Sequence, residues 1–324
     1  MSVLTPSGSE AGAEAGWSDE RPAAGDLDLL VHPGKTGWIA ITIDAARTTS
    51  SRVPEPGATP ADLAAALLGP IAARIARARR VRVRAYGAWR SVDVHALPFR
   101  GAPLLAQVAV DYPLDLQRTT PGALPQPVNS ERRALVVGDP SSDLPVAHGE
   151  AALVAKALGP RMPVQVLIGA EATSRAVAAQ LRAVGLFHYA GHGVFAGAEG
   201  WESALPLADG GRLSIGDLLA LAPAPRKVVL SGCDAARSTG GAEGLGLAQA
   251  LVAAGAEEVL APTRPVADSL AASLAAALYS GTALDAAADL APSGTLASAA
   301  RTALEAVRDQ DPRADWAAFR VLAR

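Results

Sequence analysis

Short apolar segments alternate with helix-like segments through the second half of the chain. The helix-like segments lie at 146–158, 173–183, 214–220 and 244–254. The strand-like segments around them are ALVVGD (134–139), VQVLIG (164–169), GLFHYAG (185–191), KVVLSG (227–232) and EEVLAP (257–262). Strands that alternate with helices form βαβ units. The pattern therefore predicts an α/β fold with a mostly parallel central sheet, covered by helices on both faces.

The first half of the chain is less regular. Residues 1–25 are rich in Gly, Ser, Ala, Pro and Glu, which is typical of a disordered tail. Strand-like and helix-like segments follow, among them one predicted helix over 59–80 with Thr59 at its N-cap. TTPGALPQPVNSERR (119–133) has no periodicity. We therefore expect a tail (1–25), a smaller α/β subdomain (26–130) and a larger α/β domain (131–324).

Composition excludes several classes of function. The net charge is −3, so nucleic acid is not an expected partner. The single cysteine excludes an intrachain disulfide and any zinc site with several cysteines, and we expect no metal and no cofactor. The chain contains no stretch of 18 apolar, uncharged residues, so we expect no membrane span and a cytoplasmic location.

Two chemically reactive residues directly follow strand-like segments. Cys233 is the only cysteine, and His192 stands between two glycines. In an open parallel sheet, ligands bind beyond the carboxyl ends of the strands, so both residues would lie at one edge if their strands are neighbours. An imidazole can take the proton of a nearby thiol, and the thiolate is the nucleophile. The pair therefore favours a Cys–His dyad.

Each residue alone has a simpler interpretation. A single cysteine after an apolar strand is usually a small buried hydrophobe, and Gly-His-Gly can be an ordinary turn. It is the matching position of His192 and Cys233 at two strand ends that favours the dyad. His188, earlier on the same strand as His192, is expected to be a buried structural histidine.

Several segments resemble the CHAT domain family, of the caspase, gingipain and separase clan of cysteine peptidases. LFHYAGHG (186–193) resembles the histidine motif of this family, and VVLSGCDAARS (228–238) resembles its cysteine motif. Supporting segments are found at 94–112, 134–158, 241–269 and in DWAAFRVLA (315–323), which is expected to be the last strand. The resemblance extends over roughly residues 27–324.

The resemblance implies a caspase-like sandwich that hydrolyses peptide bonds. His192 would be the general base and Cys233 the nucleophile, while the N–H groups of Gly193 and Cys233 would form the oxyanion hole. Residues 26–130 would correspond to the degenerate protease-like domain that precedes the active domain in separase-like relatives. The expected partners are a protein substrate and a separate regulatory protein, in a bacterial stress or defence pathway.

The resemblance also suggests residues that bind substrate. The acidic candidates near the site are Asp234, Glu243 and Asp268. Separase-like relatives bind a basic residue before the cleaved bond, and Asp268 has a matching place. Alternatively, Asp268 caps a helix that begins near Ser269. A preference for acidic residues would instead indicate Arg237 or Arg264, and many relatives carry a tryptophan where this chain has Arg264.

Two other functions are considered. STGGAEGLG (238–246) follows a strand and precedes a helix, as phosphate-binding loops do, but it lacks the P-loop lysine and the G-x-G-x-x-G spacing. A catalytically silent binding or scaffold module on the same fold stays open, because fold does not determine function.

Overall fold

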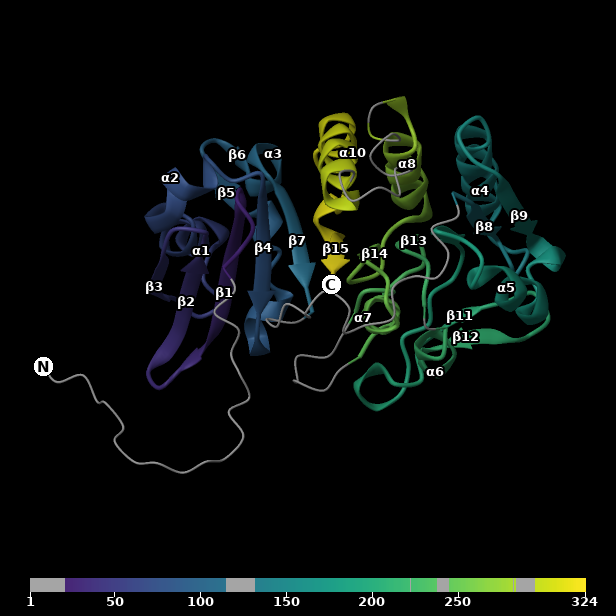
Figure 1. Ribbon diagram of the computed structural model, residues 1–324, viewed down its shortest axis with the longest axis horizontal. Helices are drawn as coiled ribbons and strands as arrows, with labels where there is room; N and C mark the ends of the chain where they lie inside the picture. Colours follow the sequence, from purple (N-terminus) through teal and green to yellow (C-terminus); the bar gives the residue numbers. More distant parts are fainter. Residues whose placement is uncertain (1–20, 115–131, 222, 238–244, 282, 284–294) are drawn as a thin grey trace, which may run out of the picture.

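One central sheet runs through the whole molecule in the computed structural model, which describes residues 21–114, 132–221, 223–237, 245–281, 283 and 295–324 (Figure 1). In spatial order its eleven strands are β3 (Thr48–Val53), β2 (Gly37–Ile43), β1 (Asp26–Gly34), β4 (Arg80–Ala85), β7 (Ala109–Pro113), β15 (Phe319–Ala323), β14 (Glu258–Pro262), β13 (Lys227–Leu230), β10 (Leu186–Ala190), β8 (Ala134–Gly138) and β9 (Val164–Ile168).

The sheet consists of two parallel blocks that run in opposite directions. Strands β9, β8, β10, β13 and β14 are parallel to one another. Strands β15, β7, β4 and β1 form the second parallel block, and β15 pairs with β14 antiparallel. The antiparallel strands β2 and β3 complete that side. The prediction of a mostly parallel sheet is confirmed.

Helices cover both faces of the sheet around β14, β13, β10 and β8, as the sequence predicts, and one face of β1, β4 and β7. Leucines and alanines of these helices bury their apolar faces on the Val-, Ile- and Leu-rich strands. The helices on one face are α1 (Pro60–Leu67), α2 (Ala72–Ile75), α3 (Leu104–Gln107), α4 (Pro145–Leu158), α8 (Asp268–Leu278) and α10 (Leu296–Gln310). Those on the other face are α5 (Ser174–Leu181), α6 (Ile215–Leu219) and α7 (Leu247–Ala253).

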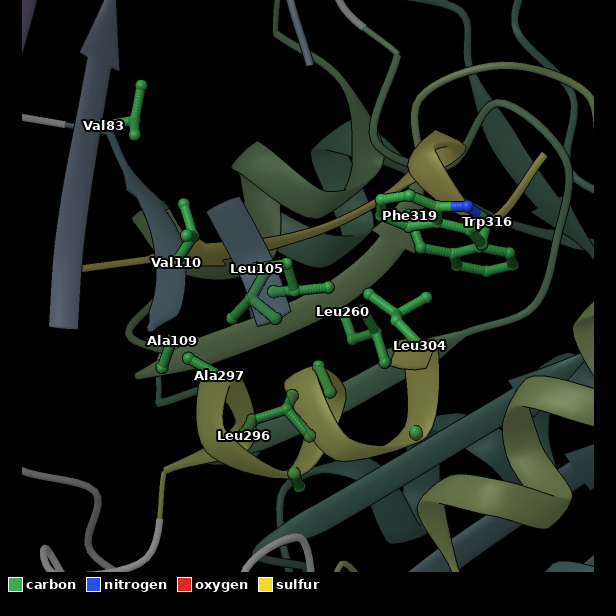
Figure 2. Packing of buried hydrophobic residues seen from close by; sticks show 14 of the residues in the cluster. Val83, Leu105, Ala109, Val110, Leu260, Leu296, Ala297, Leu304, Trp316 and Phe319 are labelled. Carbon is green, nitrogen blue, oxygen red and sulfur yellow. The ribbon is translucent and has the colours of Figure 1, made fainter. Parts of the chain in front are cut away.

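The hydrophobic core is continuous across the junction of the two strand blocks. Figure 2 shows Leu296 and Leu304 of α10 packed among Val110 of β7, Leu260 of β14 and Phe319 of β15. All five side chains are buried. The expected boundary near residue 130 and the protease-like character of 26–130 stay predictions, but both ranges share this sheet and this core.

The structure differs from the sequence prediction in several elements. The helix expected over 59–80 is interrupted by a 3-10 turn, Gly69–Ile71, because Pro70 has no N–H to donate. Thr59 does cap α1, since its side chain accepts from the N–H of Asp62. The final strand begins only at Phe319, after the 3-10 turn Trp316–Ala318. Strand β3 was not predicted, because its sequence TTSSRV is mostly polar.

Candidate active site

Strands β10 and β13 are parallel neighbours, so the prediction that connects the two sequence motifs is confirmed. Their register pairs Leu186 with Lys227 and Tyr189 with Leu230. Continued past the strand ends, the same register aligns His192 with Cys233. The two residues therefore leave the sheet side by side at its carboxyl edge.

The loops that carry them are in backbone contact. A Cβ atom built on Gly193 would overlap the carbonyl group of Cys233, so only glycine fits at this position. A Cβ built on Gly232 would lie 3.1 Å from the Gly193 nitrogen and 3.2 Å from the Gly191 oxygen. Among the described residues, neither the Gly193 N–H nor the Cys233 N–H donates a hydrogen bond. Gly193 and Cys233 are both partly exposed, and we call these two N–H groups open in the sense that they have no acceptor among the described residues.

The His192 side chain contacts a carboxylate. Its Nε2 lies 3.0 Å from Oδ1 of Asp143, and the two side chains are 44% and 59% exposed. Asp143 belongs to the loop after β8, whose conformation is set by Asp139: one oxygen of the Asp139 carboxylate accepts from the N–H groups of Asp143 and Leu144. This loop places Asp143 where it can orient the imidazole.

The backbone of His192 is also held in place. The hydroxyl of Tyr189 lies 3.0 Å from the His192 carbonyl oxygen and 2.9 Å from that of Pro206. Burial raises the pKa of Tyr189, so the phenol stays a proton donor to these carbonyl groups. Asp139 donates its N–H to the Ala190 carbonyl, which ties the Asp143 loop to the end of β10.

The Cys233 thiol is partly exposed and donates to the Val266 carbonyl oxygen at 3.6 Å. Within the part of the chain that the structure describes, it makes no hydrogen bond with His192. Such bonds are often loose in a ligand-free site and tighten when substrate binds. The next residue, Asp234, has a left-handed backbone with φ of 57°, which turns the chain sharply after the nucleophile.

A buried polar cluster lies below the site, on the α4 and α8 side of the sheet. Glu150 of α4 accepts a 2.5 Å hydrogen bond from the hydroxyl of Ser231, two residues before Cys233. The same carboxylate lies 3.0 Å from Nε2 of His188, although the alignment is not that of a hydrogen bond. The hydroxyl of Tyr279, the C-cap residue of α8, lies 3.3 Å from Nδ1 of His188. His188 is fully buried, as expected for a structural histidine.

The predicted substrate-binding acids are found in different settings. Asp268 is exposed and is the first residue of α8. The N-cap is Ala267 and no side chain caps the helix, so the alternative interpretation of Asp268 as an N-cap is wrong. Asp234 lies 3.5 Å from Arg237. Glu243 and most of the glycine-rich segment 238–246 lie outside the described residues.

The prediction from sequence missed Asp143. It follows β8 in VVGDPSSDLP, and β8 pairs with β10. The same strand-end argument that singled out His192 and Cys233 therefore applies to this loop, but its two aspartates, Asp139 and Asp143, could not be ranked without the strand order. Elsewhere, the described residues contain no cluster of three potential metal ligands. Likewise, none of the helices described is both long and apolar enough to cross a bilayer.

Comparison with solved structures places the fold among caspase-like cysteine peptidases. The chain resembles separase in the Saccharomyces cerevisiae separase–securin complex, with a TM-score of 0.51 and 14% identity over 75% of this chain and 16% of that one. It also resembles the Arg-specific cysteine proteinase gingipain R (RgpB) of Porphyromonas gingivalis, with a TM-score of 0.53 and 10% identity over 76% and 63% of the two chains. Identities this low show likeness of fold alone.

The chain therefore spans less than two thirds of the length of either structural relative. A search of curated proteins found no match. The CHAT domain family matches residues 58–324, which include β10, β13 and the loops that carry His192 and Cys233. The resemblance noted from the two motifs is confirmed, and the chain belongs to the CHAT domain family.

Proposed function

We propose that this chain is a cysteine endopeptidase that cleaves protein substrates with Cys233 and His192. The observation that carries the proposal is the close fit of the Gly193 and Cys233 backbones at two neighbouring strand ends. It supports a site with a nucleophile, a base and two open N–H groups within one small region. No metal or cofactor is needed for this chemistry.

The proposed reaction follows from these groups. His192 takes the thiol proton, and the Cys233 sulfur attacks the carbonyl carbon of the peptide bond. The Gly193 and Cys233 N–H groups bind the oxyanion that develops. The imidazolium then protonates the leaving amine, and water hydrolyses the thioester to release the acid and the free thiol. Asp143 is a positioning residue, because it contacts the imidazole rather than the reacting atoms.

Covalent labelling tests the proposal directly. Peptidyl acyloxymethyl ketones, varied at the residue next to the reactive carbon, should add one label to the chain as read by intact-mass spectrometry. Cys233→Ala should take no label, and His192→Ala should react far more slowly while its circular dichroism spectrum is unchanged. Equal labelling of wild type and His192→Ala would contradict the proposed base.

The alternative is a catalytically silent binding module on the same fold. The open Cys233 and Gly193 N–H groups favour a peptidase, because a module that only binds has no use for an oxyanion site. A chain that binds peptides but is never labelled or active would support the alternative.

Restraint by a regulatory partner is part of the proposal. The Cys233 thiol bonds to Val266 and His192 bonds to Asp143, an arrangement that suits a resting site awaiting substrate or partner. A role in bacterial stress or defence, and the identity of that partner, stay predictions. Activity that appears only after addition of a protein encoded beside this one would support the restraint.

A further inference from the structure

One helix contacts both loops of the candidate active site. Asp143, in the loop that leads into α4, lies 3.0 Å from the His192 imidazole. Glu150, in the second turn of α4, accepts a 2.5 Å hydrogen bond from Ser231, two residues before Cys233. The candidate base is therefore connected to the start of α4, and the candidate nucleophile is connected to its second turn.

Helix α4 packs closely against strand β8. A Cβ atom built on Gly138, the last residue of β8, would overlap the Cβ of Ala151 and lie 3.3 Å from the Ala147 carbonyl oxygen. Only glycine permits this close approach of helix and strand. Ala151 directly follows Glu150, and both residues are buried. The carboxyl group of Glu150 therefore has a fixed position relative to the sheet.

The segment that leads to Cys233 is held at Ser231 by its backbone and by its side chain. The Ser231 N–H donates to the Tyr189 carbonyl oxygen at 2.8 Å, which extends the pairing of β13 with β10 beyond the strand end. The Ser231 hydroxyl donates to Glu150. Because two residues of chain span at most about 7 Å, a displacement of Ser231 also displaces the thiol and the N–H group of Cys233.

The Glu150 carboxyl group is part of a larger buried polar cluster. Its Oε1 atom, which accepts from Ser231, also lies 3.0 Å from Nε2 of His188. The rings of His188 and Tyr279 meet edge-on with their centroids 5.4 Å apart, and the Tyr279 hydroxyl lies 3.3 Å from Nδ1 of His188. Glu150, His188 and Tyr279 are each at most 4% exposed. These neighbours leave the carboxyl group little freedom to turn away from Ser231.

Stability alone does not explain these polar side chains. Ionisable groups lose hydration when they are buried, and apolar side chains of similar volume are often as stable or more stable in their place. His188 stands between Val136 of β8 and Val229 of β13, and all three are buried, so an apolar side chain would suit its position. A polar cluster instead restricts its members to one orientation. The cluster is therefore suited to holding Ser231 in place.

We propose that Glu150 is a positioning residue for Cys233, which it holds through its hydrogen bond to Ser231. The rest of the buried polar cluster keeps the Glu150 carboxyl group in place. Helix α4 then sets the nucleophile and, through Asp143, the base in one frame. This inference rests on the proposed peptidase function and adds a role for side chains that the proposed reaction does not use. Loss of the hydrogen bond should slow the attack by the thiol and leave substrate binding unchanged, because the cluster lies below the site.

A matched pair of variants tests the hydrogen bond. Ser231→Thr keeps the hydroxyl, and Ser231→Val has the same shape without it. Labelling of Cys233 by a peptidyl acyloxymethyl ketone is measured over a range of ketone concentrations. At saturation, Ser231→Val should react about tenfold more slowly than Ser231→Thr, since a buried acceptor left without its donor accounts for a factor of that size. The concentration that gives half the maximal rate should be the same. Equal maximal rates would overturn the inference.

Replacement of the whole cluster separates positioning from stability. An apolar variant combines Glu150→Met, His188→Leu, Ser231→Ala and Tyr279→Phe, so that each polar member is removed together with its partner. It should unfold at a urea concentration close to that of wild type. Its labelling at saturation should nevertheless be about tenfold slower than that of wild type. A stable apolar variant that is labelled at the wild-type rate would refute the positioning role.

A measurement on the nucleophile itself needs no activity. Cys233 is the only cysteine, so isotopic labelling of cysteine nitrogen gives a single backbone amide signal in the magnetic resonance spectrum. The signal should be sharp in wild type and in the control Ser280→Ala, which changes an exposed serine after α8. It should be broadened or split in the apolar variant and in Ser231→Val, because Cys233 then occupies several positions.

The two measurements distinguish this inference from the proposed function. A broadened signal in these variants, without any labelling of wild type, would contradict the peptidase and support the positioning role. A sharp signal and a full labelling rate in the same variants would overturn the positioning role and leave the peptidase standing.

Discussion

At the residue scale, Gly193 decides whether the two candidate active-site loops can meet. Its missing side chain lets the backbone after β10 lie against Cys233, and both N–H groups stay open. The sequence motif showed a glycine beside His192. It could not show that the space is filled by the carbonyl group of Cys233, 40 positions further along, because this depends on strand order.

Gly193→Ala should reduce the rate of covalent labelling of Cys233 by about a hundredfold, the usual cost of a lost oxyanion donor. The new methyl group would displace the Cys233 carbonyl and with it the N–H groups. Gly149→Ala is the matched control: that glycine lies in α4 with open space around it, so the change should stabilise the helix by about 0.5–1 kcal/mol. Equal labelling rates in both variants would contradict the oxyanion site.

Asp143→Ala should lower the labelling rate, because the imidazole loses the carboxylate that orients it. The free energy of unfolding should change by less than about 1 kcal/mol, since both side chains are largely exposed. Asp143→Asn keeps an acceptor without the charge and should be intermediate in rate. An unchanged labelling rate in Asp143→Ala would contradict a positioning role for this carboxylate.

At the element scale, strand ends position the site and buried polar groups fix those ends. The regular alternation of strands and helices predicted β8, β10, β13 and β14, and the pairing of β10 with β13. The polar edge strand β3 and the hairpin of β11 (Ala204–Pro206) and β12 (Arg212–Ser214) could not be predicted, because their short segments lack apolar periodicity. The Asp143–His192 contact was equally hidden, since it joins two loops that are remote in sequence.

Ser231→Ala should destabilise the fold by roughly 1–3 kcal/mol, because the buried Glu150 carboxylate loses a hydrogen-bond donor. Urea unfolding measures the change. Ser280→Ala serves as the control, since that serine is exposed just after α8 and bonds only within its own turn. The Ser231 variant should also be labelled more slowly at Cys233. Similar unfolding midpoints for the two variants would contradict a role for the buried cluster.

Asp268→Ala should reduce cleavage after Arg and Lys while stability changes by less than about 1 kcal/mol, because Asp268 begins α8 without capping it. Its proximity along the chain to Val266, the partner of the thiol, supports a role next to the cleaved bond. Profiling against peptides that vary only before the cleaved bond measures the change. Asp309→Ala, at an exposed position of α10, is the control. An unchanged preference would remove Asp268 from the site.

At the scale of the whole molecule, β15 joins the two parallel blocks of strands. One face of the block that contains β1, β4 and β7 carries paired charged side chains. Asp26, Asp111, Arg80 and Arg82 form ion pairs on β1, β4 and β7, and the Asp111 side chain is fully buried. Neither Asp111 oxygen has a hydrogen-bond partner among the described residues. The apolar period of these strands was visible in the sequence, whereas the placement of β15 between β7 and β14 was not.

Burial raises the pKa of Asp111 from 3.8 to about 7, against the opposing effect of Arg80 and Arg82. Between these two pKa values the folded chain keeps a proton on Asp111 that the unfolded chain releases. The contribution of Asp111 to the free energy of unfolding is therefore fully present below pH 3.8 and is lost as the pH rises through 7. Between pH 5 and pH 8, wild type should lose about 2–3 kcal/mol more unfolding free energy than Asp111→Asn.

Urea unfolding of both proteins at the two pH values measures this difference. Burial lowers the pKa of His95 to about 4, so His95 acts in the opposite sense, stabilising the fold above pH 6.5 and less as the pH falls toward 4. Its effect is common to both proteins and cancels in the comparison. Parallel pH dependences for wild type and Asp111→Asn would contradict a protonated Asp111.

The position of β15 has a consequence for how the molecule is made. β15 pairs with both β7 and β14, yet it follows β7 by roughly two hundred residues in the chain. At synthesis rates of about 5–20 residues per second, β7 waits on the order of ten seconds or longer for its neighbour. Until β15 has been synthesised, β7 and β14 each have one edge without its neighbouring strand. The sheet is therefore completed only after every residue of the candidate site has been synthesised.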